Sequence, residues 1–272
     1  KIRKRKMLRD ITIGQYYQTD SVIHRLDPRV KLMGTMIFII SLFLDRTIWL
    51  YLGVTIFLAV VIKLSKVPLK FIVKGLKAVV ILIVFSAVFN LFLTQGEPLI
   101  TIWKLTITKE GLILAIFMVV RLLYLIMGSS LMTLTTTPNN LTDGLEKGLG
   151  FLNYIKVPVH EIAMMMSIAL RFIPILIDET DKIMKAQMAR GADFENGNLI
   201  QRAKAMIPVL VPLFISAFRR ANELAMAMEA RCYNGSKGRT KMKPLKYTKN
   251  DYIAYLILFG YLGVMIAISV IF

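Results

Sequence analysis

Cysteine and histidine are nearly absent from this chain of 272 residues, which contains one cysteine, Cys232, and two histidines. A single cysteine excludes an intramolecular disulfide bond, and so few soft ligands argue against a structural zinc site. His160-Glu161 starts like a zinc-protease motif, but Met164 stands where the second histidine ligand should be. No glycine-rich loop is followed by Lys and Ser or Thr, so the chain itself lacks a P-loop for nucleotide hydrolysis. We therefore predict no metal ligands, no cofactor and no catalytic residues in this chain.

Acidic residues are also scarce, because 17 Asp and Glu stand against 35 Lys and Arg and give a formal net charge of +18. Such an excess indicates either nucleic acid or anionic lipid as a partner. Hydrophobic residues make up 56% of the chain, and the mean hydropathy of +0.61 is high for a soluble domain. They occur in long runs, which predicts an all-α polytopic membrane protein. No apolar run with a cleavage site follows the basic segment Lys1–Lys6, so we expect no cleaved signal peptide.

We predict about five transmembrane helices. The first two, Lys31–Leu44 and Ile48–Ile62, are short for a bilayer and should form a tight hairpin around Asp45-Arg46. Lysines 63, 66, 70, 74 and 77 then predict a basic amphipathic connector at the level of the lipid headgroups. The remaining spans are predicted at Ala78–Leu93, Gly111–Leu134 and Tyr252–Phe272, with a polar interruption at Thr94–Glu110.

The distribution of positive charge predicts the orientation. With the N-terminus in the cytoplasm, segments 1–31, 63–77 and 135–250 lie inside and carry 31 of the 35 Lys and Arg. The chain then lies in the cell membrane with its C-terminus outside, and its charge reflects topology and attraction to anionic lipid. We expect no nucleic-acid partner. The predicted domains are a membrane domain with four spans (1–134), a cytosolic domain (135–250) and a final transmembrane helix (251–272).

The cytosolic segment contains three helical patterns, Asn140–Leu149, Pro158–Arg190 and Leu199–Arg231. Pro158 suits the first position of a helix, and Gly191 suits the residue just past a helix end. Prolines 174, 208 and 212 should kink the two long helices. Ala217, Ala221 and Ala225 form a row of small residues that would let another helix approach closely, so we expect the two long helices to cross there.

Two similar motifs end these long helices. Ala189-Arg190-Gly191 and Ala230-Arg231-Cys232 each place an arginine between two small residues, 41 positions apart. A cation near a helix C-terminus can simply complement the helix dipole. A matched pair instead favours docking of each guanidinium into a groove on a soluble partner, because arginine stays charged and binds carboxylates in a bidentate manner.

The ordered set of motifs resembles the transmembrane T component of energy-coupling factor (ECF) transporters. The resemblance covers nearly the whole chain. It rests on Ser21–Lys31, Thr135-Thr136-Thr137-Pro138, Leu170–Pro174, Glu179, Ala186-Gln187, the two arginine motifs and Tyr233-Asn234-Gly235. The second motif has Cys232 where a glycine would make the match more literal, and Asn234-Gly235 could end that helix instead.

This resemblance implies a scaffold rather than an enzyme. It implies that Arg190 and Arg231, with their small neighbours, dock on two ABC-type ATPase subunits, which bind ATP and magnesium. It also implies one membrane-embedded substrate-binding S component, with Ala217, Ala221 and Ala225 at the helix crossing and the S-component contact. The transported substrate would be a vitamin or another micronutrient, and the ATP-driven motion would pass through the helices to the S component.

Three points stay open at this stage. Arg121 lies inside a predicted span, where a charge indicates either a functional site or a buried pairing with carbonyl groups or with Asn90. A dedicated cobalt or nickel ECF system would have the same fold with another S component. A membrane-bound enzyme on the inner face would need clustered acid, base or nucleophilic residues, and the spans contain almost none.

Overall fold

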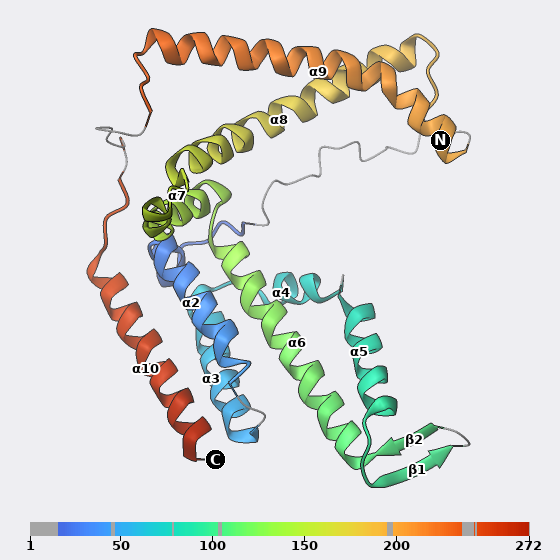
Figure 1. The fold of residues 1–272 in the computed structure, drawn as a ribbon, viewed down its shortest axis with the longest axis vertical. Coiled ribbons are helices and arrows are strands. Elements are labelled where there is room, and N and C mark those ends of the chain that lie inside the picture. Colours follow the sequence, from blue (N-terminus) through green and yellow to red (C-terminus); the bar gives the residue numbers. More distant parts are fainter. Residues whose placement is uncertain are drawn as a thin grey trace. The chain divides into compact units, whose positions relative to one another are not determined.

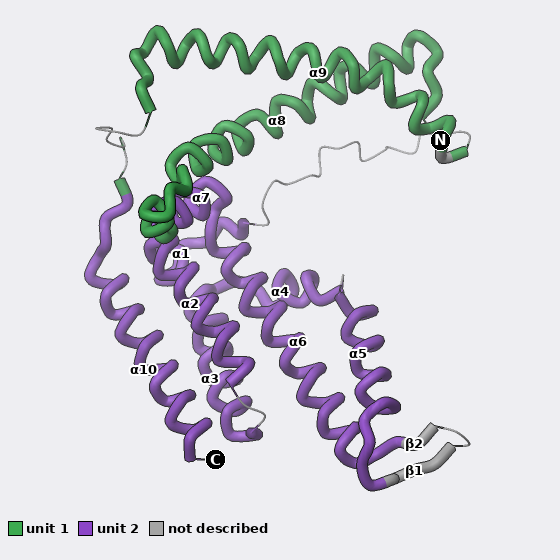
Figure 2. Tube along the Cα trace, viewed as in Figure 1, with its two compact units in different colours: residues 1–13, 148–244 green, residues 14–147, 245–272 purple. Residues whose placement is uncertain are grey.

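The computed structural model describes residues 16–44, 47–77, 79–102, 105–194, 198–235, 242 and 244–271. The chain divides into two compact units (Figure 2): unit 1 comprises residues 1–13 and 148–244, and unit 2 comprises residues 14–147 and 245–272. The final helix thus belongs to the same unit as the early spans. Residues 135–147, which the sequence assigns to the cytosolic segment, also fall in unit 2.

Unit 2 is mainly helical, and the all-α prediction is confirmed (Figure 1). One feature was not predicted: the polar interruption contains an antiparallel hairpin, in which Ile100 pairs with Ile107. The elements of unit 2 are α1 (Val22–Arg25), α2 (Pro28–Ser41), α3 (Ile48–Ser65), α4 (Leu69–Leu76), α5 (Val80–Leu93), β1 (Pro98–Ile102), β2 (Leu105–Thr108), α6 (Lys109–Thr135), α7 (Pro138–Gly148) and α10 (Lys249–Ile271).

The core of unit 2 lies between α2, α3, α6 and α10. Tyr261 of α10 stacks on Phe57 of α3 at 4.1 Å, and its hydroxyl group lies 2.8 Å from the Ser41 hydroxyl group of α2. Gly128 lets α6 approach α2 closely, because a Cβ atom there would lie 2.4 Å from the ring of Phe38. The largest buried cluster contains Phe38, Leu42, Leu50, Val54, Leu58 and Met265.

The predicted number of spans matches the structure, but the set differs. Helices α2 and α5 have 14 residues each, or about 21 Å, which is less than the roughly 30 Å of a hydrocarbon core. Helices α4 and α5 together would form one broken span. The predicted basic connector is divided, because α3 ends at Ser65 and Lys66 has a left-handed backbone. Five helices of the described residues are long and apolar enough to cross a membrane: Ile48–Ser65, Lys109–Thr135, Val159–Ala189, Ile200–Ala230 and Lys249–Ile271.

Unit 1 is built on two long helices that follow the 3-10 turn η2 (Gly150–Ile155). These are α8 (Val159–Ala189) and α9 (Leu199–Ala230), within one residue of the predicted ends. Pro158 is the N-cap residue of α8 rather than its first helical residue. Asn198 and Gln201 form a capping box that starts α9. Both helices continue through their internal prolines, and Figure 1 shows α9 bending along its length.

Candidate functional site

Helix α8 ends in a Schellman motif. Arg190 is the C-cap residue, and Gly191 follows it with a φ of +87°. The Gly191 N–H donates to the Met188 carbonyl at 3.0 Å, and the Ala192 N–H donates to the Gln187 carbonyl at 3.0 Å. These two bonds satisfy carbonyl groups that the helix end would otherwise leave free. The chain therefore turns away sharply just after the arginine.

Helix α9 ends in the same way. Arg231 is the C-cap residue, and Cys232 takes the left-handed position with a φ of +55°. The Cys232 N–H donates to the Glu229 carbonyl at 2.8 Å, and the Tyr233 N–H donates to the Met228 carbonyl at 3.0 Å. Cysteine thus occupies the position that glycine takes in α8.

The two ends share their exposure as well as their backbone geometry. The expectation that Asn234-Gly235 ends α9 is wrong, because the turn is complete at Cys232. All six predicted docking residues are exposed in the structure, so each guanidinium group can be reached by a partner. These residues are Ala189, Arg190, Gly191, Ala230, Arg231 and Cys232.

The two long helices contact each other through a polar cluster. Glu179 of α8 accepts a hydrogen bond from the Ser216 hydroxyl group at 2.6 Å and pairs with Arg220 Nη2 at 3.0 Å. Ser216 is buried, Arg220 is half-buried, and the fully buried Val209 lies two turns before Ser216 on α9. Val209, Ser216 and Arg220 are seven and four residues apart, which places them on one face of α9.

The alanine row does not form this contact. Ala217 is half-buried, but Ala221 and Ala225 are exposed. The expectation that the long helices cross on this row is therefore wrong. Successive residues of a helix are rotated by about 100°, so the row starting one residue after Ser216 faces away from α8.

The ion pair lies at matching positions of the two helices. Glu179 stands 11 residues before Arg190, and Arg220 stands 11 residues before Arg231. Each arginine therefore lies about 16 Å along its helix from the pair. Since α8 and α9 run in roughly opposite directions (Figure 1), the two arginines point away from each other and lie on the order of 30 Å apart.

A stripe of large apolar side chains follows the outer face of α9. Its members repeat at intervals of three and four residues, which is the spacing of one helical face. Exposed Ala221 and Ala225 continue the same stripe. Exposed apolar patches of this kind mark interaction surfaces. This apolar face of α9 was not identified from the sequence, although the intervals of three and four residues between its members could have shown it. The stripe consists of Ile207, Leu210, Val211, Phe214, Ile215 and Phe218.

Comparisons with known proteins identify the family. Residues 19–242 match the family described as cobalt transport protein (CbiQ). The energy-coupling factor transporter transmembrane protein EcfT of Clostridium kluyveri is 58% identical over 252 residues, covering 92% of this chain and 93% of the relative. The protein of the same name from Bacillus subtilis is 47% identical over 246 residues, covering 90% and 92%. The chain belongs to the energy-coupling factor transporter transmembrane protein family. The predicted resemblance is confirmed, and this ECF component is a multi-pass membrane subunit of a transporter.

Arg121 and Asn90 of this ECF component do not pair with each other. Arg121 Nε donates to the Tyr51 hydroxyl group at 3.1 Å, and its guanidinium carbon lies 5.4 Å from the centre of the Phe43 ring. Asn90 Nδ2 donates to the Ser86 carbonyl at 2.8 Å within its own helix. Tyr51 belongs to the first turn of α3, so Arg121, in the middle of α6 (Lys109–Thr135), lies at the level where α3 begins.

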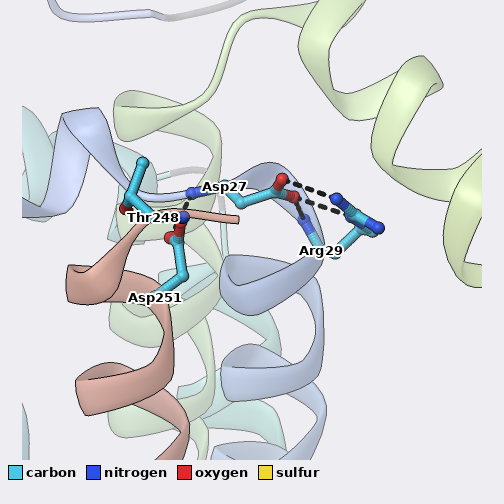
Figure 3. A network of polar contacts seen from close by, with 4 residues as sticks. All are labelled: Asp27, Arg29, Thr248 and Asp251. Carbon is cyan, nitrogen blue, oxygen red and sulfur yellow. Dashed lines mark hydrogen bonds and ion pairs between the residues drawn. The ribbon is translucent and has the colours of Figure 1, made fainter. Parts of the chain in front are cut away.

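A second polar network in unit 2 joins the start of α2 to the start of α10 (Figure 3). Asp27 caps α2 by accepting from the Arg29 N–H at 2.9 Å and pairs with the Arg29 guanidinium group at 2.9 Å. Asp251, which is 1% exposed, accepts from the Asp27 N–H at 2.8 Å and from the Thr248 N–H and hydroxyl group at 2.7 Å each. The Arg29 guanidinium group also lies 3.9 Å from the centre of the Tyr247 ring. This network fixes the segment that leads into the last helix.

Two titratable groups beside α1 are shifted by their surroundings. Partial burial lowers the pKa of His24, although a hydrogen bond to the Tyr17 carbonyl opposes the shift. Since His24 Nε2 must donate to that carbonyl, Nδ1 accepts from the Ser21 hydroxyl group at 2.7 Å in the neutral ring. The hydrogen bond and charge of Arg25 lower the pKa of exposed Asp20.

Metal-binding geometry is not found in the described part of the chain. No three side chains of His, Cys, Asp or Glu gather there in a way that would hold an ion.

Proposed function

We propose that unit 1 lies in the cytoplasm and couples this membrane subunit to two ABC-type ATPases. Arg190 docks on one ATPase and Arg231 docks on the other. ATP and magnesium bind to those partners, and this chain contributes no catalytic group. The observation that carries the proposal is the pair of exposed arginines on matching Schellman turns at the two helix ends.

The separation of the arginines supports two partners rather than one. Ends on the order of 30 Å apart exceed the reach of a single groove of ordinary size, because a guanidinium side chain extends only a few ångströms beyond its helix. Exposed small residues flank each arginine, so a partner backbone can close around it. Bidentate bonds from arginine to a carboxylate would give each contact a fixed direction.

The S component binds, in this proposal, along the outer stripe of α9. Phe214 and Phe218 are 66% and 62% exposed, and their ring centres lie 5.4 Å apart. The exposed Ala221 and Ala225 extend the stripe with small side chains, which permit close approach of a membrane helix. We therefore propose that Ala221 and Ala225, the exposed residues of the alanine row, contact the S component as expected from the sequence.

The orientation follows from the charge distribution. We place the N-terminus and unit 1 in the cytoplasm and the C-terminus outside, in agreement with the positive-inside rule. Helices α8 and α9 are long and apolar enough to span a membrane. However, acidic Asp178, Glu179 and Asp181 stand together in the second half of α8, and such groups are costly in hydrocarbon. Both helices therefore lie against the membrane or the S component.

The mechanism is mechanical. When ATP closes the ATPase pair, both docked helix ends move with it. The Glu179–Arg220 contact holds the two helices together, so the displacement reaches the stripe on α9 and tilts the S component. The substrate, a vitamin or another micronutrient, binds to the S component and not to this chain.

The test is co-purification of the ATPases with variants of the full chain. Arg190→Ala combined with Arg231→Ala should remove both ATPases and abolish uptake, while the chain still inserts into the membrane. Arg219→Ala is the matched control, because Arg219 is an exposed arginine on α9 away from both ends. Normal ATPase recovery and normal transport by the double variant would refute the docking role.

A dedicated cobalt transporter is the second candidate, because the matching family is described as cobalt transport protein. The curated relatives, by contrast, carry the general ECF name and no substrate. Purification of the chain from its native membrane separates the two candidates: one metal-binding partner supports the dedicated system, and several different S components support a shared scaffold.

A further inference from the structure

Unit 2 contains a second feature that the coupling role does not use. An apolar groove of about 260 Å³ lies between α1, α2, α3, α6 and α10. Its buried lining includes Val30, Phe38, Leu58, Leu131 and Leu258. Its exposed lining comes from α1, α3 and α10, with Val22, Leu64, Ile253 and Ile257 about half exposed. The groove therefore opens on a flank of the unit that is formed by half-exposed apolar side chains of α1, α3 and α10.

A single charged residue lines this groove, namely Lys31 near the start of α2. Its Nζ atom donates to the His24 carbonyl at 3.1 Å and to the Thr135 carbonyl at 2.9 Å. An ammonium group has three donors, so one remains for another acceptor. No carboxylate of the described residues forms an ion pair with Lys31. Asp251 and Asp27 act on Lys31 through space without forming an ion pair with it. The remaining donor of Lys31 is therefore the charged group that the groove offers to an acceptor such as a phosphate.

We propose that the groove binds one acyl chain of an anionic phospholipid, whose phosphate accepts a hydrogen bond from Lys31. The groove follows α2 from Lys31 to Phe38, a rise of about 10 Å. A cation at one end and apolar walls beyond it match the two parts of a phospholipid.

The lining of the groove favours a lipid over a helix from a partner subunit, because one cation stands at one end and the walls beyond it are apolar. A flexible hydrocarbon chain fits such a narrow space, and its headgroup can stay at the polar end beside Lys31 and Asn250.

The first test uses the unaltered chain and therefore needs no variant to fold. The full-length protein in detergent, with any co-purifying subunits, is given phosphatidylglycerol and phosphatidylcholine with identical acyl chains, and bound lipid is counted by native mass spectrometry. One basic side chain near the headgroup predicts about fivefold preference for the anionic lipid. Equal retention of the two lipids would overturn the proposal. Displacement of phosphatidylglycerol by inorganic phosphate would also overturn it, because the site would then bind a free anion.

Three variants locate the lipid. Lys31→Met should bring the two lipids to equal retention, and Lys31→Arg should keep the preference. Ala254→Phe places a ring in the groove and should lower retention of both lipids, whereas Ala267→Phe, on the exposed surface of the same helix, should leave retention unchanged. Full retention by Ala254→Phe, with a melting temperature like that of the unaltered chain, would show that the lipid binds elsewhere.

Discussion

Replacing Asp251 by alanine should destabilise this protein more than any exposed substitution in α10. The carboxylate is 1% exposed and accepts three hydrogen bonds, one from the Asp27 N–H and two from Thr248. Truncation leaves these donors without their acceptor inside the protein. Hydrogen bonds to a charged group contribute about 1.5–3 kcal/mol each, and unsatisfied buried donors cost about 1–3 kcal/mol. Because Thr248 can partly rotate toward solvent, we expect a total loss of about 3–5 kcal/mol.

The assay is thermal unfolding in detergent, followed by fluorescence-detected size exclusion. A loss of about 3–5 kcal/mol corresponds to a fall in melting temperature of roughly 10 °C for a chain of this size. Asp251→Asn keeps one acceptor oxygen for the Asp27 N–H and should lose about half as much. Asn250→Ala changes the exposed neighbour in the same helical turn and should melt within about 2 °C of the unaltered protein. A melting temperature for Asp251→Ala equal to that of Asn250→Ala would refute the reasoning.

Three further predictions concern other parts of the chain. Cys232→Gly should stabilise the end of α9 and Gly191→Ala should destabilise the end of α8, each by about 1 kcal/mol, because both positions have a positive φ. Hydrogen exchange at the two turns measures this, and equal effects of the same sign would contradict it. Phe214→Glu should abolish co-purification of the S component but not of the two ATPases. Loss of the ATPases instead would mean that the apolar stripe of α9 binds the ATPases and not the S component. Burial lowers the pKa of His24, so the unfolded chain binds a proton more readily and stability falls as the pH drops through about 6.5. The melting temperatures at pH 7.5 and pH 5.5 should therefore differ less for His24→Gln than for the unaltered protein. An equal difference in the two proteins would exclude His24 as the cause of the pH dependence.

The sequence predicted helices best where local chemistry alone defines their ends. Gly191 ends α8 as predicted, because a left-handed glycine acts within a few residues. The first span was predicted to start at Lys31, and α2 starts three residues earlier, at Pro28, where the Asp27 carboxylate caps it. The exposure of Arg190 and Arg231 agrees with the docking interpretation. Their partners still await the co-purification test.

The errors arose where distant residues decide the structure. The crossing of α8 and α9 depends on Glu179 and Arg220, and no local pattern shows that an acidic residue on one helix will meet a basic residue on another. The contact of Arg121 with Tyr51 spans 70 positions of the chain, and it was not among the alternatives left open, which were a functional site or a pairing with carbonyl groups or Asn90. Sequence periodicity gives the faces of a helix, but it does not tell which face meets which neighbour.

The ion pair between Glu179 and Arg220 has a consequence for symmetry. These residues are 41 positions apart, the same interval that separates Arg190 from Arg231. An interval of 41 thus relates each position of α8 to an equivalent position of α9. Two equivalent positions that contact each other lie beside a local two-fold axis, as at the centre of an isologous interface. A rotation of 180° about that axis would exchange Arg190 and Arg231. Two ATPase subunits related by a matching two-fold axis would therefore each meet one arginine in an equivalent position, although this chain is a single subunit.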